Sequence, residues 1–373
     1  MKIAVFGLRG IPDVPGGVET HCQGLYPTLV KLGCEVTIFT RSPYIAKEKR
    51  VTQWNGVRFI HLWTPKHKSM EAITHSFMST LMACFGRYDL VHVHAIGPAL
   101  LIPILKLFGR KVVLTHHGSD YERSKWGWLA RTILRAGARV GVKNADGVIA
   151  ISNGIKDMIA QKYSKEAYFI PNGVELPSAT IGSEGVKRWG LLPKQYVLTV
   201  ARFVPEKGLL DLIRAYKRIE KPGFKLVIAG DADHETDYSN EVKRLAEKVE
   251  NVFLTGYLSG EMLAKLYANA GLFALCSYHE GLPIALLEAL SHGLDVLVSD
   301  IPQHKEVQLD PLCYFETGNV DELSEKLVES FSKKSKDESN RYLLMLKTLY
   351  NWDRIAEKTK SVYEQVLNEP CIT

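Results

Sequence analysis

The chain has 373 residues, of which 46% are hydrophobic and 24% are charged, and its formal net charge is +6. This length favours two domains, and the composition is ordinary for a soluble globular protein. The longest apolar stretch, residues 95–109, contains two prolines, a lysine and two glycines. It is shorter than the roughly 18–20 apolar residues that a membrane-spanning helix needs, which disfavours a transmembrane protein.

The first residues lead directly into a strand-like run, without the basic segment, apolar segment and cleavage site of a signal peptide. The six cysteines are scattered and contain no C-x-x-C pair. We therefore expect reduced thiols rather than a disulfide framework, and a cytoplasmic protein.

Charge is distributed unevenly along the chain. Residues 1–173 contain 23 Lys and Arg against 11 Asp and Glu, a net charge of +12, whereas residues 174–373 contain 24 against 30, a net charge of −6. This asymmetry indicates that the first half meets an anionic partner. No nucleic-acid recognition module accompanies the charge, so we expect no nucleic acid and favour an anionic membrane surface or a phosphorylated acceptor.

Short runs of apolar and β-branched residues recur along the chain and are separated by amphipathic segments of helix length. The runs are residues 2–7, 34–40, 57–63, 90–95, 111–117, 147–152, 167–173, 196–202, 225–230, 251–256, 272–277 and 295–300. Because nearly every residue in them is apolar, we expect parallel strands covered by helices on both faces. The repeated strand–helix order predicts an α/β fold with two doubly wound, Rossmann-like sheets.

A segment rich in proline, glycine and serine, residues 172–195, separates the two sets of strands. We therefore expect one domain over residues 1–173 and a second over residues 174–352. The last residues, 353–373, are predicted to form an amphipathic helix that starts near Trp352.

The first expected strand is followed by a glycine-rich turn that includes Gly16 and Gly17. Such a turn before a helix suggests a dinucleotide site, but the G-x-G-x-x-G pattern is absent. The second strand ends at Arg41 rather than at an acidic residue, which disfavours NAD and leaves NADP open. We expect no cofactor.

Histidines lie at the ends of two expected strands. His116 and His117 end the run 111–117, and His92 and His94 alternate on the run 90–95. A zinc cluster stays open for this group, but no carboxylate or cysteine completes it at a recognisable spacing, so we expect no metal site. Asp120, near these histidines, is a candidate general base on the side of an acceptor substrate.

Residues 123–143 combine cations with tryptophan and leucine at helical spacing. The cations are Arg123, Lys125, Arg131, Arg135, Arg139 and Lys143, and the apolar residues are Trp126, Trp128, Leu129, Ile133 and Leu134. This pattern suits a helix that lies on an anionic inner membrane leaflet beside an acceptor site. A helix packed on the core with a solvated basic face is the alternative.

The segment YVLTVARFVPEKGLLDLIRAY reads as strand, loop and helix, with Arg202 at the end of the strand and Lys207 at the start of the helix. Two cations and a helix N-terminus at one point suit a diphosphate whose charge grows as a glycosidic bond breaks. The alternative is a pair of solvated surface cations.

Asp231 and Asp233 form a D-x-D pattern, which can bind a divalent metal. This pattern occurs often by chance, and here it follows the strand-like run 225–230. We interpret Asp231 as a turn residue and expect activity without Mn²⁺.

The segment LFALCSYHEGLPIALLEALSHG is again strand, loop and helix, with Leu282 and Pro283 opening the helix and Gly293 ending it. Glu280 lies in the entry loop and Glu288 inside the helix, so that the two carboxylates can reach opposite ends of an extended ligand. The site opens at the carboxyl end of a parallel strand, where ligands bind in such sheets. The alternative is a core helix whose glutamates are solvated or cap it.

These segments resemble glycosyltransferase family 4, a family of retaining enzymes with the GT-B fold, in which two Rossmann-like domains face a cleft. The family signature has two glutamates eight residues apart, with Gly-Leu-Pro after the first. Glu280, Gly281, Leu282, Pro283 and Glu288 match this signature. The resemblance covers nearly the whole chain, and its specific motifs are concentrated between residues 196 and 293.

The resemblance implies roles for residues of the second half. Glu280 and the neighbouring backbone would meet the hydroxyls of the donor sugar, and Glu288 would bind the nucleotide ribose. Arg202 and Lys207 would stabilise the leaving diphosphate.

The resemblance also implies roles for residues of the first half. Gly16 and Gly17 would let the donor phosphate and the acceptor approach the backbone. His116, preferred here over His117, would contact the donor sugar near the reacting carbon. The pattern G-I-P-x-x-x-G-G-x-E-T is most similar to members that build bacterial surface polysaccharides, rhamnosyltransferase-like ones among them.

The function implied by the resemblance is a retaining, metal-independent transfer of a hexose-type sugar from a nucleotide diphosphate, with UDP preferred. The acceptor would be a glycan or a polyprenyl- or lipid-linked sugar bound by the first domain, to which the final helix returns. No enzyme nucleophile is placed by the spacing, which favours a same-face substitution in which the leaving phosphate accepts the acceptor's proton.

Three other functions stay open. A nucleotide-sugar 2-epimerase shares the two-domain fold, and it would act without an acceptor. A non-catalytic nucleotide-sugar-binding protein is disfavoured by the intact Arg202, Lys207, Glu280 and Glu288. An NADP oxidoreductase would need a cofactor that the glycine pattern does not support.

Overall fold

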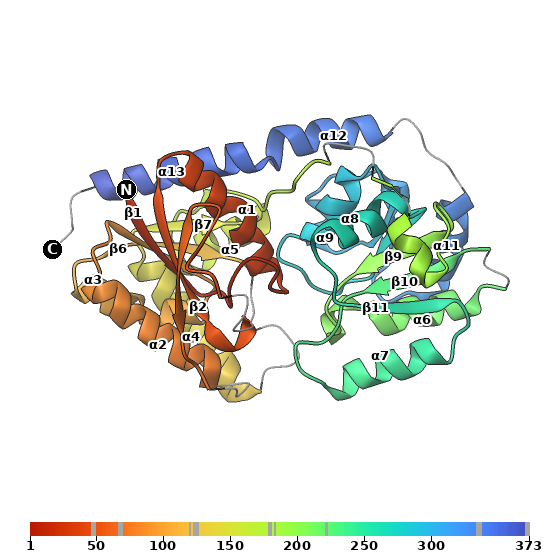
Figure 1. Ribbon diagram of the computed structural model, residues 1–373, viewed down its shortest axis with the longest axis horizontal. Coiled ribbons are helices and arrows are strands. Elements are labelled where there is room, and N and C mark those ends of the chain that lie inside the picture. The colour runs from red at the N-terminus through yellow and green to blue at the C-terminus, as the bar shows by residue number, and fades with distance from the viewer. Residues whose placement is uncertain are drawn as a thin grey trace. The chain divides into compact units, whose positions relative to one another are not determined.

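The computed structural model describes residues 1–45, 50–65, 70–118, 121, 127–177, 181–182, 184–220, 223–332 and 338–369. The chain divides into two compact units. Unit 1 consists of Met1–Gly173 and Tyr350–Thr373, and unit 2 consists of Val174–Leu349. Each unit is built on one sheet of mainly parallel strands with helices on both faces, so the predicted α/β fold class of two doubly wound, Rossmann-like domains is confirmed (Figure 1).

The sheet of unit 1 has eight strands in the order β3-β4-β2-β1-β5-β6-β7-β8. Its strands are β1 Lys2–Phe6, β2 Glu35–Arg41, β3 Gln53–Trp54, β4 Val57–Leu62, β5 Leu90–His94, β6 Lys111–His116, β7 Gly147–Ala150 and β8 Tyr168–Phe169. All neighbouring pairs are parallel except β3 and β4. The short antiparallel strand β3 was not expected from the sequence, because two residues are too few to give a hydrophobic period.

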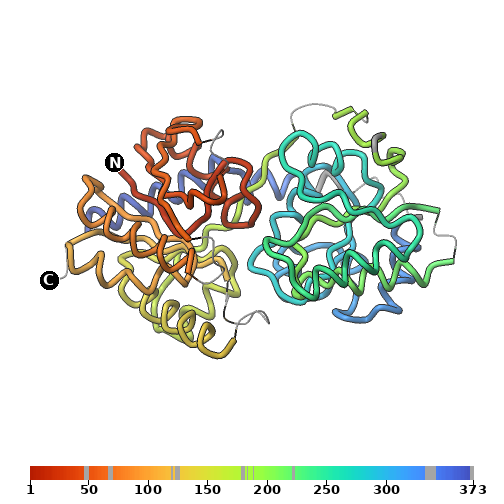
Figure 2. The backbone as a smooth tube through the Cα atoms, turned by 60° about the horizontal axis from the view of Figure 1, so that its bottom comes forward, coloured from red at the N-terminus to blue at the C-terminus, as the bar shows by residue number. Residues whose placement is uncertain are grey.

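The helices of unit 1 are α1 Gly17–Lys31, α2 Met70–Phe85, α3 Ile102–Leu107, α4 Trp128–Asn144, α5 Asn153–Tyr163 and α13 Trp352–Asn368, with 3-10 turns at Ser42–Tyr44 and Pro98–Leu101. Helices α1 and α13 lie side by side on one face of the sheet, and α2, α3 and α4 lie on the other (Figure 1). The C-terminal helix α13, blue in both views, therefore lies with the red and orange elements of the first half (Figures 1 and 2).

Trp352 at the start of α13 anchors this return of the chain. Its indole packs so closely on Gly24 and Gly173 that a Cβ atom at these two positions would lie 2.2 and 2.5 Å from ring atoms. Further along α13, Ile355, Val362 and other apolar residues enter the core cluster formed by β1, β2 and α1. The expected amphipathic helix at the C-terminus thus buries its apolar face in unit 1.

The sheet of unit 2 has six strands in the order β11-β10-β9-β12-β13-β14, and all its pairs are parallel. Its strands are β9 Tyr196–Val200, β10 Lys225–Ala229, β11 Val252–Gly256, β12 Leu272–Leu275, β13 Val296–Ser299 and β14 Tyr314–Phe315. Nearly every residue of β9, β10, β12 and β13 is buried, as expected for strands covered on both faces.

The helices of unit 2 are α6 Leu209–Arg218, α7 Asp237–Glu247, α8 Gly260–Asn269, α9 Ile284–Ser291, α10 Pro302–Lys305, α11 Val320–Ser332 and α12 Glu338–Leu349, with 3-10 turns at Glu184–Trp189, Pro205–Lys207 and Pro311–Cys313. Among the described residues, no helix combines the length and the apolar composition that crossing a bilayer requires.

Candidate functional site

The strand order of unit 2 reverses between β9 and β12, which are hydrogen-bonded neighbours although they are the first and fourth strands of that unit in sequence order. In open parallel sheets, the loops that leave the carboxyl ends of two such strands form the ligand-binding crevice. Arg202 and Lys207 follow β9, and Glu280 and Glu288 follow β12. The fold therefore brings the cationic segment and the acidic segment of the sequence to the same edge of the sheet.

Lys207 and Glu280 join these two loops directly. The Lys207 ammonium donates a hydrogen bond to Oε1 of Glu280, and the Ser277 hydroxyl donates to the same oxygen over 2.6 Å. Burial alone would raise the pKa of Glu280. The electrostatic effects of Lys207 and His304 and the two hydrogen bonds lower this pKa by more than burial raises it, so that the net shift is downward. The carboxylate of Glu280 is therefore ionised at neutral pH.

The backbone of the two loops is also in close contact. Gly208 has a φ of +60°, and a Cβ atom there would lie 2.1 Å from the carbonyl oxygen of Cys276. The Tyr278 N–H donates to the Glu206 carbonyl over 2.8 Å. Lys207 ends the 3-10 turn Pro205–Lys207 and α6 begins only at Leu209, so the expectation that Lys207 starts the helix is wrong. The left-handed Gly208 separates the two elements.

Arg202 forms an ion pair with Asp233, with 2.9 Å between Nη1 and Oδ2. Asp231 accepts a hydrogen bond from the Ala232 N–H over 2.8 Å and pairs with Lys243 over 3.0 Å. Both aspartates of the D-x-D pattern are thus engaged with cations of the protein, and Asp231 makes the local backbone contact of a turn residue.

Glu288 lies one turn inside α9. Pro283 is the N-cap of this helix, which begins at Ile284 rather than at the expected Leu282. The Tyr267 hydroxyl donates to Oε2 of Glu288 over 2.9 Å. Burial raises the pKa of Glu288 to about 7, although the hydrogen bond from Tyr267 lowers it. The carboxyl group of Glu288 therefore titrates near neutral pH. Gly281 and Leu282 lie in the loop just before α9.

In unit 1, the glycine-rich turn after β1 is organised by a buried ion pair. Glu19 accepts hydrogen bonds from the backbone N–H of Arg9 over 3.0 Å and from its Nε over 3.2 Å. A Cβ atom at Gly16 would lie 2.0 Å from Oε2 of Glu19, whereas Gly17 has no heavy atom near its missing Cβ among the described residues. The local structure thus explains a glycine at position 16, and it leaves the backbone of Gly17 open to a ligand.

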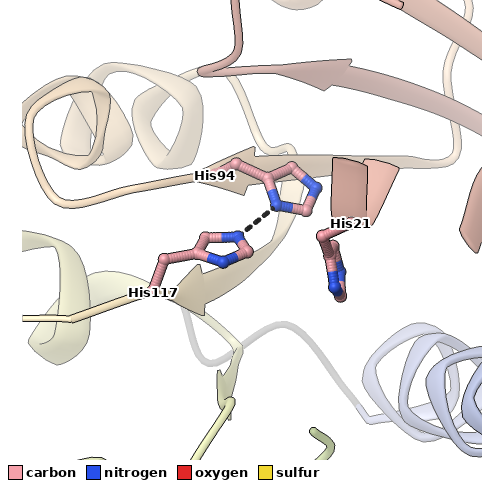
Figure 3. A group of neighbouring side chains, drawn as sticks. All are labelled: His21, His94 and His117. Atoms are coloured by element: carbon pink, nitrogen blue, oxygen red, sulfur yellow. Dashed lines mark hydrogen bonds between the residues drawn. The ribbon is translucent and has the colours of Figure 1, made fainter. Parts of the chain in front are cut away.

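The histidines of unit 1 separate into two positions. His116 ends β6 and is fully buried, and its Nδ1 accepts a hydrogen bond from the Gly118 N–H over 3.3 Å. His117 is half-buried and faces His94 and His21 (Figure 3). Asp120, the candidate acceptor-side base, lies outside the described residues.

Arg41, which left an NADP site open, is buried and forms an ion pair with Glu71, with 3.3 Å between Nη1 and Oε1. The Tyr44 hydroxyl donates to the same carboxylate oxygen over 2.6 Å. This arginine is thus engaged within unit 1 rather than presented to a phosphate.

Several contacts of the site were missed by the sequence analysis. Tyr267 donates a hydrogen bond to Glu288 and Ser277 donates one to Glu280, but a tyrosine on one helix and a serine after a strand carry no motif. His21 was also missed, although it follows Glu19 by two residues on the helix that starts at Gly17. Helix α1 follows β1, and β1 and β5 are adjacent in the sheet. The sequence analysis did not predict this strand order, so it carried no signal that His21 lies near His94.

Two family models match the chain. The model described as Glycosyltransferase Family 4 matches residues 15–177, and the model described as Glycosyl transferases group 1 matches residues 187–343. The matches meet near the division between the two units and include the segments of Gly16, His116, Arg202 and Glu280.

Known proteins are also similar to the chain. An uncharacterized glycosyltransferase of Methanocaldococcus jannaschii is 24% identical over 98% of both chains. The UDP-Gal:alpha-D-GlcNAc-diphosphoundecaprenol alpha-1,3-galactosyltransferase of Escherichia coli is 30% identical over 58% of each chain. The structure of HepE from Anabaena in complex with UDP and glucose superimposes with a TM-score of 0.79 at 17% identity and covers 98% of this chain and 100% of that one.

Proposed function

Because this chain is a GT-B glycosyltransferase of the family 4 type, we propose that it transfers a hexose-type sugar from a UDP-sugar with retention of configuration. The proposed acceptor is a glycan or a polyprenyl- or lipid-linked sugar in the synthesis of a bacterial surface polysaccharide. UDP and an acceptor on a lipid diphosphate both appear in the name of the E. coli relative, and UDP appears in the HepE complex.

The arrangement of Arg202, Lys207, Glu280 and Glu288 around the β9–β12 switch point carries this proposal. A nucleoside diphosphate sugar carries two negative charges on its diphosphate and a diol on its ribose. Arg202 and Lys207 supply the positive charge for the diphosphate, and the ionised Glu288 accepts hydrogen bonds from the ribose hydroxyls. Without donor, Lys207 is held by Glu280 and Arg202 by Asp233, so both cations are kept in place by acidic partners.

Arg202 and Lys207 act most strongly when the bond between the sugar C1 and the diphosphate oxygen breaks, because negative charge then grows on the leaving group. The acceptor oxygen forms the new bond to C1 on the same face, and its proton goes to the leaving phosphate oxygen. Glu280 and the backbone at Gly281, Leu282 and Pro283 orient the sugar hydroxyls, and neither glutamate acts as a nucleophile.

Gly16, Gly17 and His116 are the donor contacts that we propose for unit 1. The open space beside Gly17 supports its role.

The transfer is proposed to be metal-independent and cofactor-independent. The ion pairs of Asp231 with Lys243 and of Asp233 with Arg202 support this, because a D-x-D metal site needs carboxylates that are available to the ion. Added Mg²⁺ or Mn²⁺ is expected to leave the rate of transfer unchanged.

An anionic membrane is proposed to bind unit 1 at its α2–α3–α4 face. Helix α4 packs through small residues, since a Cβ atom at Gly137 or Gly141 would lie 2.3 or 2.4 Å from the chain at residues 96–99. Its large apolar residues remain exposed beside exposed basic ones. The exposed residues of this face include Ile73, Phe77, Phe85, Leu107, Phe108, Trp128, Leu129 and Ile133, with Arg135, Arg139 and Lys143.

The exposure on this face argues against the alternative of a core-packed basic helix. Trp128 is 80% exposed, Leu107 84% and Phe85 74%, and apolar side chains flanked by cations suit the interface of an anionic bilayer. A cytoplasmic enzyme bound to the inner leaflet in this way would be confined to the same membrane surface as a lipid-linked acceptor.

The proposed transfer is tested by incubating the protein with UDP-sugars, with and without a polyprenyl-diphosphate-linked sugar. We expect free UDP and an extended acceptor only when the acceptor is present. Release of UDP without an acceptor, together with a 2-epimerised sugar, would support the nucleotide-sugar 2-epimerase instead. Tight binding of UDP-sugar without either product would support a non-catalytic binding protein.

A further inference from the structure

We propose that His21, His94 and His117 of unit 1 form a binding site for a divalent cation of the zinc class. The three side chains come from α1, from the end of β5 and from the residue after β6, and they turn toward one another (Figure 3). Each offers one imidazole nitrogen, and these nitrogens all lie within 4.8 Å of one another. Imidazole is a preferred ligand of zinc and of neighbouring divalent transition metals.

The spacing of the rings fits one central ion. The ring centroids of His21 and His117 are 5.1 Å apart, those of His94 and His117 are 5.2 Å apart, and those of His21 and His94 are 5.7 Å apart. Three imidazoles bound to a tetrahedral ion through bonds of about 2.1 Å have centroids roughly 5 Å apart. Small rotations of the side chains would bring the nitrogens to their bonding distance.

The outer contacts of the rings leave ligand atoms on the inner side. Nε2 of His94 is hydrogen-bonded to the hydroxyl of Tyr26, so Nδ1 is the atom that faces His117. Such an outer hydrogen bond fixes the orientation of a metal-binding imidazole. Nδ1 of His21 is buried and has no hydrogen-bond partner among the described residues, and the ring also hydrogen-bonds with Asn172. A buried nitrogen without a partner costs free energy, which an ion would recover.

Nδ1 of His94 and Nε2 of His117 are 2.9 Å apart and share one proton in the absence of metal. Binding of a cation moves this proton to the other nitrogen of the same ring, since both facing nitrogens then direct lone pairs at the ion. Burial lowers the pKa of His94 and His117 well below the ordinary value and that of His21 to about 4. The three rings are therefore in the neutral form that metals bind.

This site is separate from the D-x-D pattern of unit 2 and from the proposed donor contacts on β9 and β12. A bound ion would connect α1 to the ends of β5 and β6 next to the glycine-rich turn. Three protein ligands leave a fourth position for water or another oxygen ligand. The site would hold the turn in place whether or not the proposed sugar transfer is correct.

The test uses the full chain, purified without a histidine tag and freed of metal by dialysis against a chelator. Zn²⁺ is titrated by calorimetry, and Co²⁺ is titrated by visible absorption, which reports tetrahedral coordination. The variants are His21→Gln and His117→Gln, and the matched control is His61→Gln, a half-buried histidine of β4 in the same unit. Circular dichroism of the metal-free variants verifies that each is folded.

We expect one ion per chain in the wild type and in His61→Gln, intense visible absorption with Co²⁺, and a higher melting temperature with Zn²⁺. Each cluster variant should bind at least about tenfold more weakly. The proposal is overturned if the wild type binds no stoichiometric metal, or if the cluster variants bind Zn²⁺ as tightly as His61→Gln does. If His21→Gln does not fold, the wild-type cobalt spectrum and the partly exposed His117→Gln still decide between these outcomes.

Discussion

The ammonium of Lys207 is hydrogen-bonded to the carboxylate of Glu280, and this contact joins the loop after β9 to the loop after β12. The two residues are 73 positions apart in the chain. Their contact follows from the strand order, because β9 and β12 are neighbours in the sheet. The pair places a cation and a carboxylate at the point where a doubly wound sheet binds its ligand.

Replacing Lys207 by Ala is expected to lower kcat about 10²–10³-fold, since one group that stabilises charge in the transition state is lost. KM for the UDP-sugar should change much less. Steady-state kinetics at saturating acceptor measure both constants. The matched control is Lys217→Ala, an exposed lysine on the neighbouring α6, which should retain full activity. Equal losses in both variants would point to a general charge effect.

The affinity for UDP is expected to rise with pH around neutrality because of Glu288. Its pKa lies at about 7, and only the ionised carboxylate can accept two hydrogen bonds from the ribose. Below pH 7 the dissociation constant should therefore increase up to about tenfold per pH unit relative to that of Glu288→Gln, which has no titrating group. Titration calorimetry from about pH 5.5 to 8.5 measures both proteins. Parallel pH profiles would contradict the assignment.

The same group makes a prediction for stability. The pKa of Glu288 is raised in the folded protein, so its protonated form contributes stability that is complete below the ordinary carboxyl pKa and lost as pH rises through about 7. The free energy of unfolding of the wild type should thus fall relative to that of Glu288→Gln between about pH 5 and 8. Urea titrations at several pH values measure the difference. A difference that grows with pH in favour of the wild type would show that the carboxyl is not buried as described.

Replacing Gly208 by Ala is expected to destabilise unit 2 and to weaken UDP binding, because the new Cβ atom would lie 2.1 Å from the Cys276 carbonyl oxygen. Gly256→Ala is the matched control, since Gly256 also has a positive φ, of +71°, but has no heavy atom within 4 Å of that position among the described residues. Both variants lose about 1 kcal/mol to backbone strain. Gly208→Ala should lose a further 1–3 kcal/mol, roughly, from the clash. Equal melting temperatures for the two variants would contradict the close contact.

Much of the fold could be predicted from the sequence, because apolar runs such as residues 225–230 and 272–277 carry their own signal of buried parallel strands. The position of Arg202 and Glu280 at strand ends followed from the same runs. Strand order did not, since the pairing of β9 with β12 is set by long-range packing. The short strands β3 and β14 and the start of α9 at Ile284 were missed, because two residues give no period and a proline can precede a helix as well as open it.

Side-chain partners were the least predictable part. The buried Tyr267 that holds Glu288, and His21 that faces His94 and His117, lie on helices whose spacing fits ordinary core packing. Tyr267 and His21 reach these partners only because their helices pack against the sheets. The histidine cluster shows this most clearly, since its members at positions 21, 94 and 117 come from α1, from β5 and from the loop after β6.

Binding to anionic vesicles is expected for the wild type and not for a variant with Leu107→Ser and Trp128→Ser, which removes two of the most exposed apolar side chains of the α2–α3–α4 face. Flotation with vesicles that contain phosphatidylglycerol, compared with neutral phosphatidylcholine vesicles, measures the difference. Leu192→Ser, an exposed leucine of unit 2, is the control and should bind like the wild type. Failure of the wild type to float with either vesicle would remove the membrane from the proposed partners.

The central claim is that the cations after β9 bind the diphosphate of a nucleotide donor. Titration calorimetry of UDP and of uridine, with wild type and with the double variant Arg202→Ala/Lys207→Ala, tests it most directly. Two charge-assisted contacts of about 1.5 kcal/mol each predict that the wild type binds UDP about a hundredfold more tightly than uridine. The double variant should bind both alike. Equal affinity of the wild type for UDP and uridine, or a preference for UDP that survives in the double variant, would contradict the account.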